Sequence, residues 1–82
     1  VKLPNGEELN EKAKTFIQQR DFTSAVPVLK QAANLGSAES QYNLAICLFE
    51  GLGITKDEKQ ANEWLLKSAQ QNYANAQFKL AY

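Results

Sequence analysis

The sequence predicts an all-α fold: antiparallel helix hairpins stacked side by side into a solenoid, or α–α superhelix, of about two and a half repeats. Three observations predict it. Apolar residues recur at helical rather than strand spacing. Capping residues and glycines separate stretches of about a dozen residues. A shift of 36 residues lays the sequence on itself and places Asp21 on Asp57 and Ala25 on Ala61.

The first predicted helix starts after Asn5 and runs to about Gln19. Asn5 and Glu8 have the spacing of a capping box, in which the cap side chain accepts a hydrogen bond from the backbone three residues on. The apolar residues of this stretch recur every three to four positions and so share one helical face. They are Leu9, Ala13, Phe16 and Ile17.

The second predicted helix spans about 23–35, after a turn at residues 20–22. Gly36 follows it and is well placed for a left-handed helix cap. Pro27 would then lie near the first turn, where a missing N–H costs little. If the helix begins at Asp21 instead, Pro27 should kink it.

The third predicted helix spans about 38–50 and is broken by the loop sequence Gly51-Leu52-Gly53-Ile54. The fourth begins at Asp57, where Gln60 completes a capping-box spacing. Asn72 stands in for a capping glycine after it, because Asn tolerates the left-handed conformation. The buried stripe of the fourth helix should be Ala61, Trp64, Leu65, Ser68 and Ala69.

We expect one domain over residues 1–82, with repeat units at about 5–37 and 38–73 and a partial unit at 74–82. A fifth helix should begin near Asn75. Four alanines occupy positions where paired helices would cross closely, and larger apolar side chains should fill the space between. These alanines are Ala13, Ala25, Ala45 and Ala61.

The overall composition excludes several classes of protein. Nine basic and nine acidic residues cancel, so no nucleic-acid or acidic-membrane partner is indicated. No apolar run approaches the roughly 20 residues of a membrane span, and the N-terminus is not a signal peptide. We expect a soluble chain without membrane insertion, and slightly favour the cytoplasm over the periplasm or secretion. Since Val occupies position 1, we expect a piece of a longer or processed chain.

Residues 40–69 combine small residues, a Gly-x-Gly loop and apolar residues in an order that is typical of one repeat family. The matching residues are Ser40, Leu44-Ala45, Leu48, Gly51-Leu52-Gly53-Ile54, Asp57, Ala61, Trp64 and Lys67-Ser68-Ala69. This stretch resembles the Sel-one-like repeat, a relative of the tetratricopeptide repeat. Residues 7–39 resemble the same unit without the Gly-x-Gly insertion. The departures are mild: Ala45 for Gly, Leu48 for Tyr and Asn72 for Gly. The resemblance implies a scaffold whose concave groove binds partner proteins, and it names no partner.

The sequence offers no catalytic or metal-binding constellation. There is no His, which removes the commonest general base and metal ligand. Cys47 is a lone thiol on an apolar helix face and is interpreted as a packed small hydrophobe. The Gly51-x-Gly53 loop lacks the Lys-Ser/Thr of a phosphate-binding loop. We therefore expect a protein that is not an enzyme and that has no cofactor and no metal site.

Five polar residues form the candidate partner-binding stripe. Asn10, Lys14 and Gln18 repeat at helical spacing on the first helix. Asn43 lies near the equivalent face of the third helix, and Lys79 takes the same place on the fifth. Tetratricopeptide domains that hold a peptide's terminal carboxylate use Asn and Lys on these faces, so the resemblance implies an acidic-peptide site. A merely solvated helix face remains the alternative.

An aromatic and aliphatic stripe runs along the third helix at Tyr42, Ile46 and Phe49. Packing onto the neighbouring helix is favoured over an exposed hydrophobic anchor. The fifth helix would leave Leu80 and Tyr82 uncovered, which predicts weak self-association through the C-terminal helix or marginal stability.

Two functions follow from this sequence. The first is a protein-interaction module that binds a partner protein or peptide in the concave groove of its repeats. The second is a structural cap or spacer in a longer helical-repeat protein, with no partner of its own.

Overall fold

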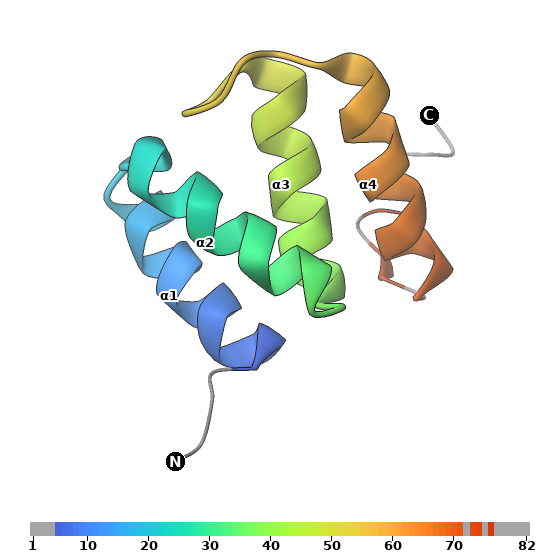
Figure 1. Ribbon diagram of the computed structural model, residues 1–82, viewed down its shortest axis with the longest axis horizontal. Helices are drawn as coiled ribbons and strands as arrows, with labels where there is room; N and C mark the ends of the chain where they lie inside the picture. The colour runs from blue at the N-terminus through green and yellow to red at the C-terminus, as the bar shows by residue number, and fades with distance from the viewer. Residues whose placement is uncertain (1–4, 72, 75, 77–82) are drawn as a thin grey trace.

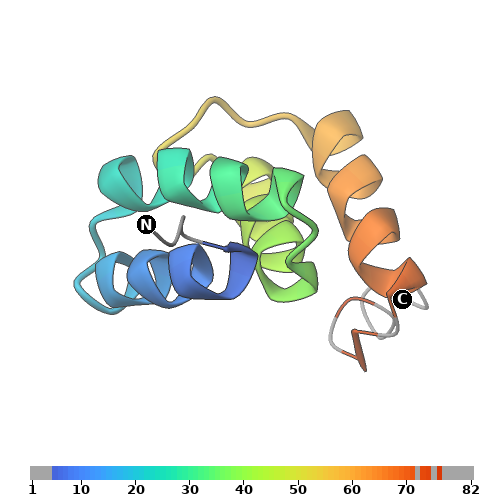
Figure 2. The same cartoon turned by 60° about the horizontal axis from the view of Figure 1, so that its bottom comes forward.

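The computed structural model describes residues 5–71, 73, 74 and 76. These residues form four α-helices and no strand, and each helix has 13 residues. Consecutive helices pack against each other, so that two antiparallel hairpins stand side by side (Figures 1 and 2). The all-α stacked-hairpin prediction is confirmed. The helices are α1 (Gly6–Gln18), α2 (Phe22–Asn34), α3 (Ala38–Glu50) and α4 (Glu58–Gln70).

All four helices begin with the same capping contact. The side chains of Asn5, Asp21, Ser37 and Asp57 each accept a hydrogen bond from the backbone N–H three residues on, at 2.9, 3.2, 3.2 and 3.0 Å. Each contact satisfies one of the free N–H groups at a helix start. The sequence identified the caps at Asn5 and Asp57. It assigned Asp21 to a turn and did not single out Ser37.

The second helix differs from its predicted bounds. It starts at Phe22 rather than Thr23, so that Pro27 is its sixth residue and lies beyond the first turn. The expectation that Pro27 sits where a missing N–H costs least is therefore wrong. Pro27 has no N–H for the carbonyl of Thr23, yet α2 continues to Asn34. Both Thr23 and Pro27 are exposed, so water can reach that carbonyl.

Left-handed residues end the first two helices. Gly36 has φ +96°, as predicted, and the next residue, Ser37, donates its N–H to the carbonyl of Ala32 at 3.1 Å. This is the Schellman arrangement that commonly ends a helix. Arg20 has the same role after α1, with φ +58°. This left-handed conformation is energetically unfavourable for any residue that has a side chain. The sequence did not reveal it.

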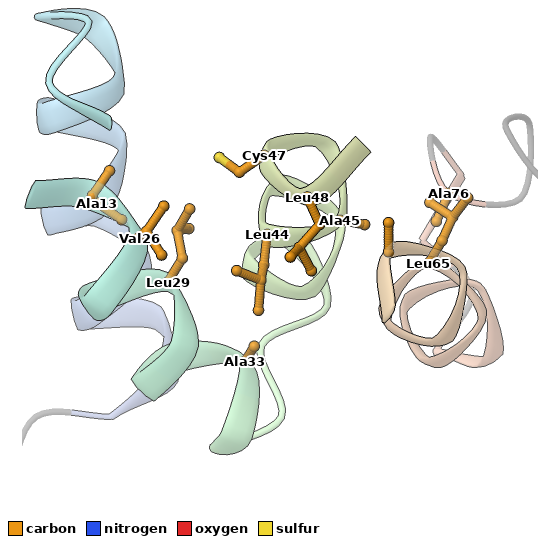
Figure 3. Packing of buried hydrophobic residues seen from close by; sticks show 12 residues of the cluster. Ala13, Val26, Leu29, Ala33, Leu44, Ala45, Cys47, Leu48, Leu65 and Ala76 are labelled. Atoms are coloured by element: carbon orange, nitrogen blue, oxygen red, sulfur yellow. The ribbon is translucent and has the colours of Figure 1, made fainter. Parts of the chain in front are cut away.

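The core lies along the three contacts between consecutive helices. All four predicted crossing alanines are fully buried, which lets the helix backbones approach closely. Leu29 of α2 and Leu44 and Leu48 of α3 are the largest fully buried apolar side chains (Figure 3). In the predicted stripe of α4, Ala61, Leu65 and Ser68 are buried. Trp64 and Ala69 of that stripe are only half-buried.

The loop between α3 and α4 folds back onto the preceding hairpin. Figure 1 shows it reaching toward the start of α2. At Gly53 a Cβ atom would lie 2.5 Å from the carbonyl carbon and oxygen of Phe22, closer than real Cβ atoms come. Gly53 also has φ +68°. A glycine is therefore required here both by conformation and by space.

Some predictions fall outside the described residues. These concern Asn72 as a helix cap, most of the fifth helix and its role in self-association, and Lys79 as a binding residue. Among the helices that are described, none has both the length and the apolar character to cross a membrane. The described residues also hold no group of three or more potential metal ligands.

Candidate protein-interaction groove

A groove of about 960 Å³ opens where the starts of α1 and α3 lie together, and we call it the α1/α3 groove. The turn between α2 and α3 and the residues after α4 complete its walls. Figure 2 shows the start of α1 beside α3. The lining residues are Asn5, Gly6, Glu7, Glu8, Asn10, Glu11, Leu35, Gly36, Ser37, Ala38, Glu39, Gln71 and Tyr73.

Of the described residues of the predicted stripe, Asn10 alone lines this groove. It is not an exposed stripe residue, because its side chain is only 4% exposed. The buried hydroxyl of Ser40 donates to Asn10 Oδ1 at 2.6 Å, which links α1 to α3. Asn10 is thus buried rather than part of an open, solvated face, and it helps to join the two hairpins. Its part in partner binding stays a prediction.

Lys14 lies beside the groove, and its charge is already engaged. Its Nζ atom is 3.2 Å from Glu39 Oε2 and 3.5 Å from Glu11 Oε1. The hydrogen bond and charge of Glu39 raise the pKa of Lys14 above its usual range. A peptide carboxylate would have to compete with both glutamates for this ammonium group.

The other two described residues of the predicted stripe, Gln18 and Asn43, do not line the groove. Gln18 is exposed at the end of α1, and Asn43 is half-buried one turn after Glu39 on α3. The structure therefore brings Asn10 and Lys14 to the same α1–α3 contact and leaves Gln18 and Asn43 further along the two helices. Their part in binding stays a prediction.

The groove has residues that sequence reasoning missed. Leu35 and Glu39 flank the turn between α2 and α3, whereas Tyr73 follows α4, and only the tertiary fold brings Tyr73 to the other two. Glu8 was identified in the sequence, but only through its capping-box spacing from Asn5. No local pattern marks Leu35 as a wall residue, and its side chain is 59% exposed.

Two members of the predicted α3 stripe, Tyr42 and Phe49, pack against the core as the sequence favoured, and the third, Ile46, is half-buried. The ring of Tyr42 lies 5.5 Å from that of Tyr73, and both rings pack against the core, as does Phe49. Gln41 holds the same region by donating to the carbonyl of Ala33 and accepting from Gln71 Nε2 at 2.9 Å. These contacts attach the residues after α4 to α3 and so fix one wall of the groove.

Cys47 is a buried core residue, with 3% of its surface exposed. Burial, and secondarily the charge of Glu50, raises the pKa of its thiol to about 11. The interpretation of Cys47 as a packed small hydrophobe is confirmed.

A smaller hollow of about 290 Å³ lies between α2 and α4. Lys30, Trp64 and Lys67 contribute to it, and Lys67 Nζ lies 4.6 Å from the centre of the Trp64 ring. The half-buried indole thus forms a cation–π contact within the protein itself.

Comparison with known proteins gives two matches. Residues 38–73 match the family model of the Sel1 repeat. The chain is also 38% identical over 56 residues to the chitin synthase regulator SKT5 of Saccharomyces cerevisiae. That similarity covers 68% of this chain and 8% of the yeast protein, so the chain spans a small part of that relative.

Proposed function

We propose that this chain is a protein-interaction module that binds a segment of a partner protein in the α1/α3 groove. The premise is that the chain belongs to the Sel1 repeat family through its second unit, residues 38–73. The proposal includes no catalytic step. The chain contains no His, and its thiol is buried.

The observation that carries this proposal is the groove itself. Its volume of about 960 Å³ is at the upper end of the size of ligand pockets, and its walls come from α1, α3 and two connecting segments. Because the backbone of these segments is fixed by helix caps and by the Tyr42–Tyr73 contact, the groove needs little ordering when a partner binds.

The yeast relative is named as a regulator of an enzyme, chitin synthase, which fits a binding rather than a catalytic role. Since this chain spans 8% of that protein, the relative supports the class of function and no particular partner.

Filling the groove tests the proposal. Ala38 is half-buried at the start of α3 and lines the groove, whereas Asn62 is exposed on α4 and does not. The tagged chain would be used to capture partners from a source lysate, comparing wild type with Ala38→Trp and Asn62→Trp. We expect capture to be lost only with Ala38→Trp, after circular dichroism has shown that both variants fold.

The outcomes separate the two functions that the sequence left open. Equal capture by all three proteins would place the binding surface elsewhere and overturn the groove. Absence of any specific protein in all three captures would favour the spacer in a longer repeat array.

A further inference from the structure

We propose that the α1/α3 groove selects a cationic ligand: an extended segment of a partner protein that presents Lys or Arg next to an apolar side chain. This inference rests on the proposed function and reverses the sign of charge that the residue pattern of the sequence suggested.

The lining of the groove carries only one sign of charge. Glu7, Glu8, Glu11 and Glu39 are part of it, and among the described residues no Lys or Arg is. Beside the groove, the ammonium group of Lys14 is held by two of these carboxylates, Glu11 and Glu39. Glu8 has an interaction of its own, so the argument below also holds with Glu8 left out.

The helix ends at the groove do not cancel these charges. The N-termini of α1 and α3 each contribute a partial charge of about +0.5. The C-terminal ends of α2 and α4, at Leu35 and Gln71, contribute about −0.5 each. Three carboxylates, set against Lys14 and these four helix ends, leave a net charge of about −2, and including Glu8 makes it about −3. An acidic segment would therefore be repelled, while a basic one would gain at least one charge contact.

Asn10 gives a second and independent indication of a ligand. Asn10 is only 4% exposed, and it lines the groove. The Ser40 hydroxyl donates to the Oδ1 atom of Asn10, and among the described residues no hydrogen-bond partner is found for the Nδ2 group of Asn10. Among the described residues, no side-chain N or O atom that is sealed from solvent lacks a partner, so the Nδ2 group of Asn10 is not sealed from solvent.

A half-satisfied buried amide fits a peptide better than a bare ion. Because Oδ1 accepts from Ser40, the remaining group of the Asn10 amide is its NH₂, which can donate to a backbone carbonyl of an extended segment. The carboxylates around it can then bind the charged ends of side chains from the same segment. The combination favours a polypeptide with basic residues over a free polyamine or a metal cation.

An apolar wall completes the site. Leu35 is 59% exposed, and Tyr73 stands half-buried on the same lining. The hydrocarbon stems of Lys and Arg, or a neighbouring apolar residue, can cover this surface while the charged groups reach the glutamates.

Two defined probes test the inference. One is a fluorescein-labelled nine-residue peptide of Lys, Ala and Leu, and the other has Glu in place of each Lys. Binding would be measured by fluorescence anisotropy at about 50 and 300 mM salt, a span over which exposed charge contacts weaken. We expect the basic peptide to bind at least about tenfold more tightly than the acidic one at low salt.

A matched pair of variants localises the charge. Glu11→Gln with Glu39→Gln removes two groove carboxylates, whereas Glu50→Gln with Glu63→Gln removes two that do not line the groove. Net charge changes equally in both. We expect the groove pair to weaken the basic peptide about five- to tenfold and the control pair less than about twofold. Equal weakening by the two pairs would mean unspecific attraction and would overturn the inference.

Nuclear magnetic resonance separates this inference from the proposed function. With the basic peptide added, the Asn10 side-chain NH₂ and the amides of Gly36 and Glu39 should shift, and Ala38→Trp should remove the shifts. If the acidic peptide shifts these signals equally or more strongly, the groove binds peptides and only the cationic selectivity is overturned. If neither peptide shifts them, the inference fails by itself, because the lysate capture tests the groove independently.

Discussion

The two helix hairpins have helices of equal length, but the loops that connect the two helices of each hairpin differ in length. Residues 19–21 connect α1 to α2, whereas residues 51–57 connect α3 to α4. The first helices of the two units therefore begin 32 residues apart, at Gly6 and Ala38, and the second helices 36 apart, at Phe22 and Glu58. The insertion of four residues changes the loop and leaves the helices alone.

What stays constant between the units is the helix crossing. Ala13 corresponds to Ala45 and Ala25 to Ala61 when the helix starts are aligned, and all four are fully buried. What differs is the contact to the preceding unit, since only the longer loop places a glycine, Gly53, against Phe22. Small residues thus define each hairpin, while the inserted loop joins one hairpin to the other.

The largest effect should come from adding a methyl group to that loop contact. Gly53→Ala combines a left-handed φ with a 2.5 Å approach to Phe22, so we expect a loss of about 2–4 kcal/mol in the free energy of unfolding. Gly36→Ala is the matched control, because its φ is +96° but nothing lies within 4 Å. It should cost about 1 kcal/mol. Equal losses in urea unfolding would show that the loop does not hold the units together.

Equivalent positions on α1 and α3 should differ in thiol reactivity. Cys47 corresponds to Thr15, which is exposed. With its pKa at about 11 rather than 9.0, Cys47 should react at pH 8 about a hundredfold more slowly than an ordinary thiol, and faster as the pH approaches 11. Thr15→Cys with Cys47→Ala supplies the exposed thiol for comparison in a maleimide or Ellman assay. Similar rates would contradict the burial of Cys47.

The contact between α1 and α3 can be tested by removing Asn10. Asn10→Ala leaves the buried Ser40 hydroxyl without its acceptor, so we expect a loss of about 1–2 kcal/mol in the free energy of unfolding. Gln18→Ala, at an exposed position of the same helix, should change it by less than about 0.5 kcal/mol. If Ser40→Ala and Asn10→Ala add fully in the double variant, the hydrogen bond does not couple the hairpins.

The smallest predicted effect is a gain in stability at the short connection. Arg20 holds φ +58°, which glycine adopts without strain, so Arg20→Gly should stabilise the fold by about 0.5–1 kcal/mol. The reverse change in the other unit, Gly51→Arg at φ +70°, should destabilise it. Thermal unfolding would detect both shifts, and a loss of stability in Arg20→Gly would show that the short turn is not strained.

Much of the fold could be predicted because its signals are local. Helix periodicity, the Asn5 and Asp57 caps and the glycine after α2 depend on residues within a few positions of one another. The one-residue error at the start of α2 has a local cause as well, since Asp21 can be read either as part of a turn or as a cap.

The candidate site was less predictable because its parts come from distant segments. Helical spacing puts Asn10 and Lys14 on one face, but it does not show that Ser40 buries the first and Glu39 pairs the second. Pairing depends on how α3 is set against α1, which the sequence pattern of either helix alone does not specify. The acidic character of the groove was missed for the same reason.

By itself, then, the sequence determined four helices, their hairpin pairing and the alanines at their crossings, because hydrophobic period and capping chemistry act over short distances. The tertiary structure decided that the inserted loop closes on Phe22, that Asn10 is buried, and that four glutamates from two helices line one groove. Those outcomes depend on the relative placement of whole hairpins. That placement is set by the packing of side chains 30 or more residues apart in the chain.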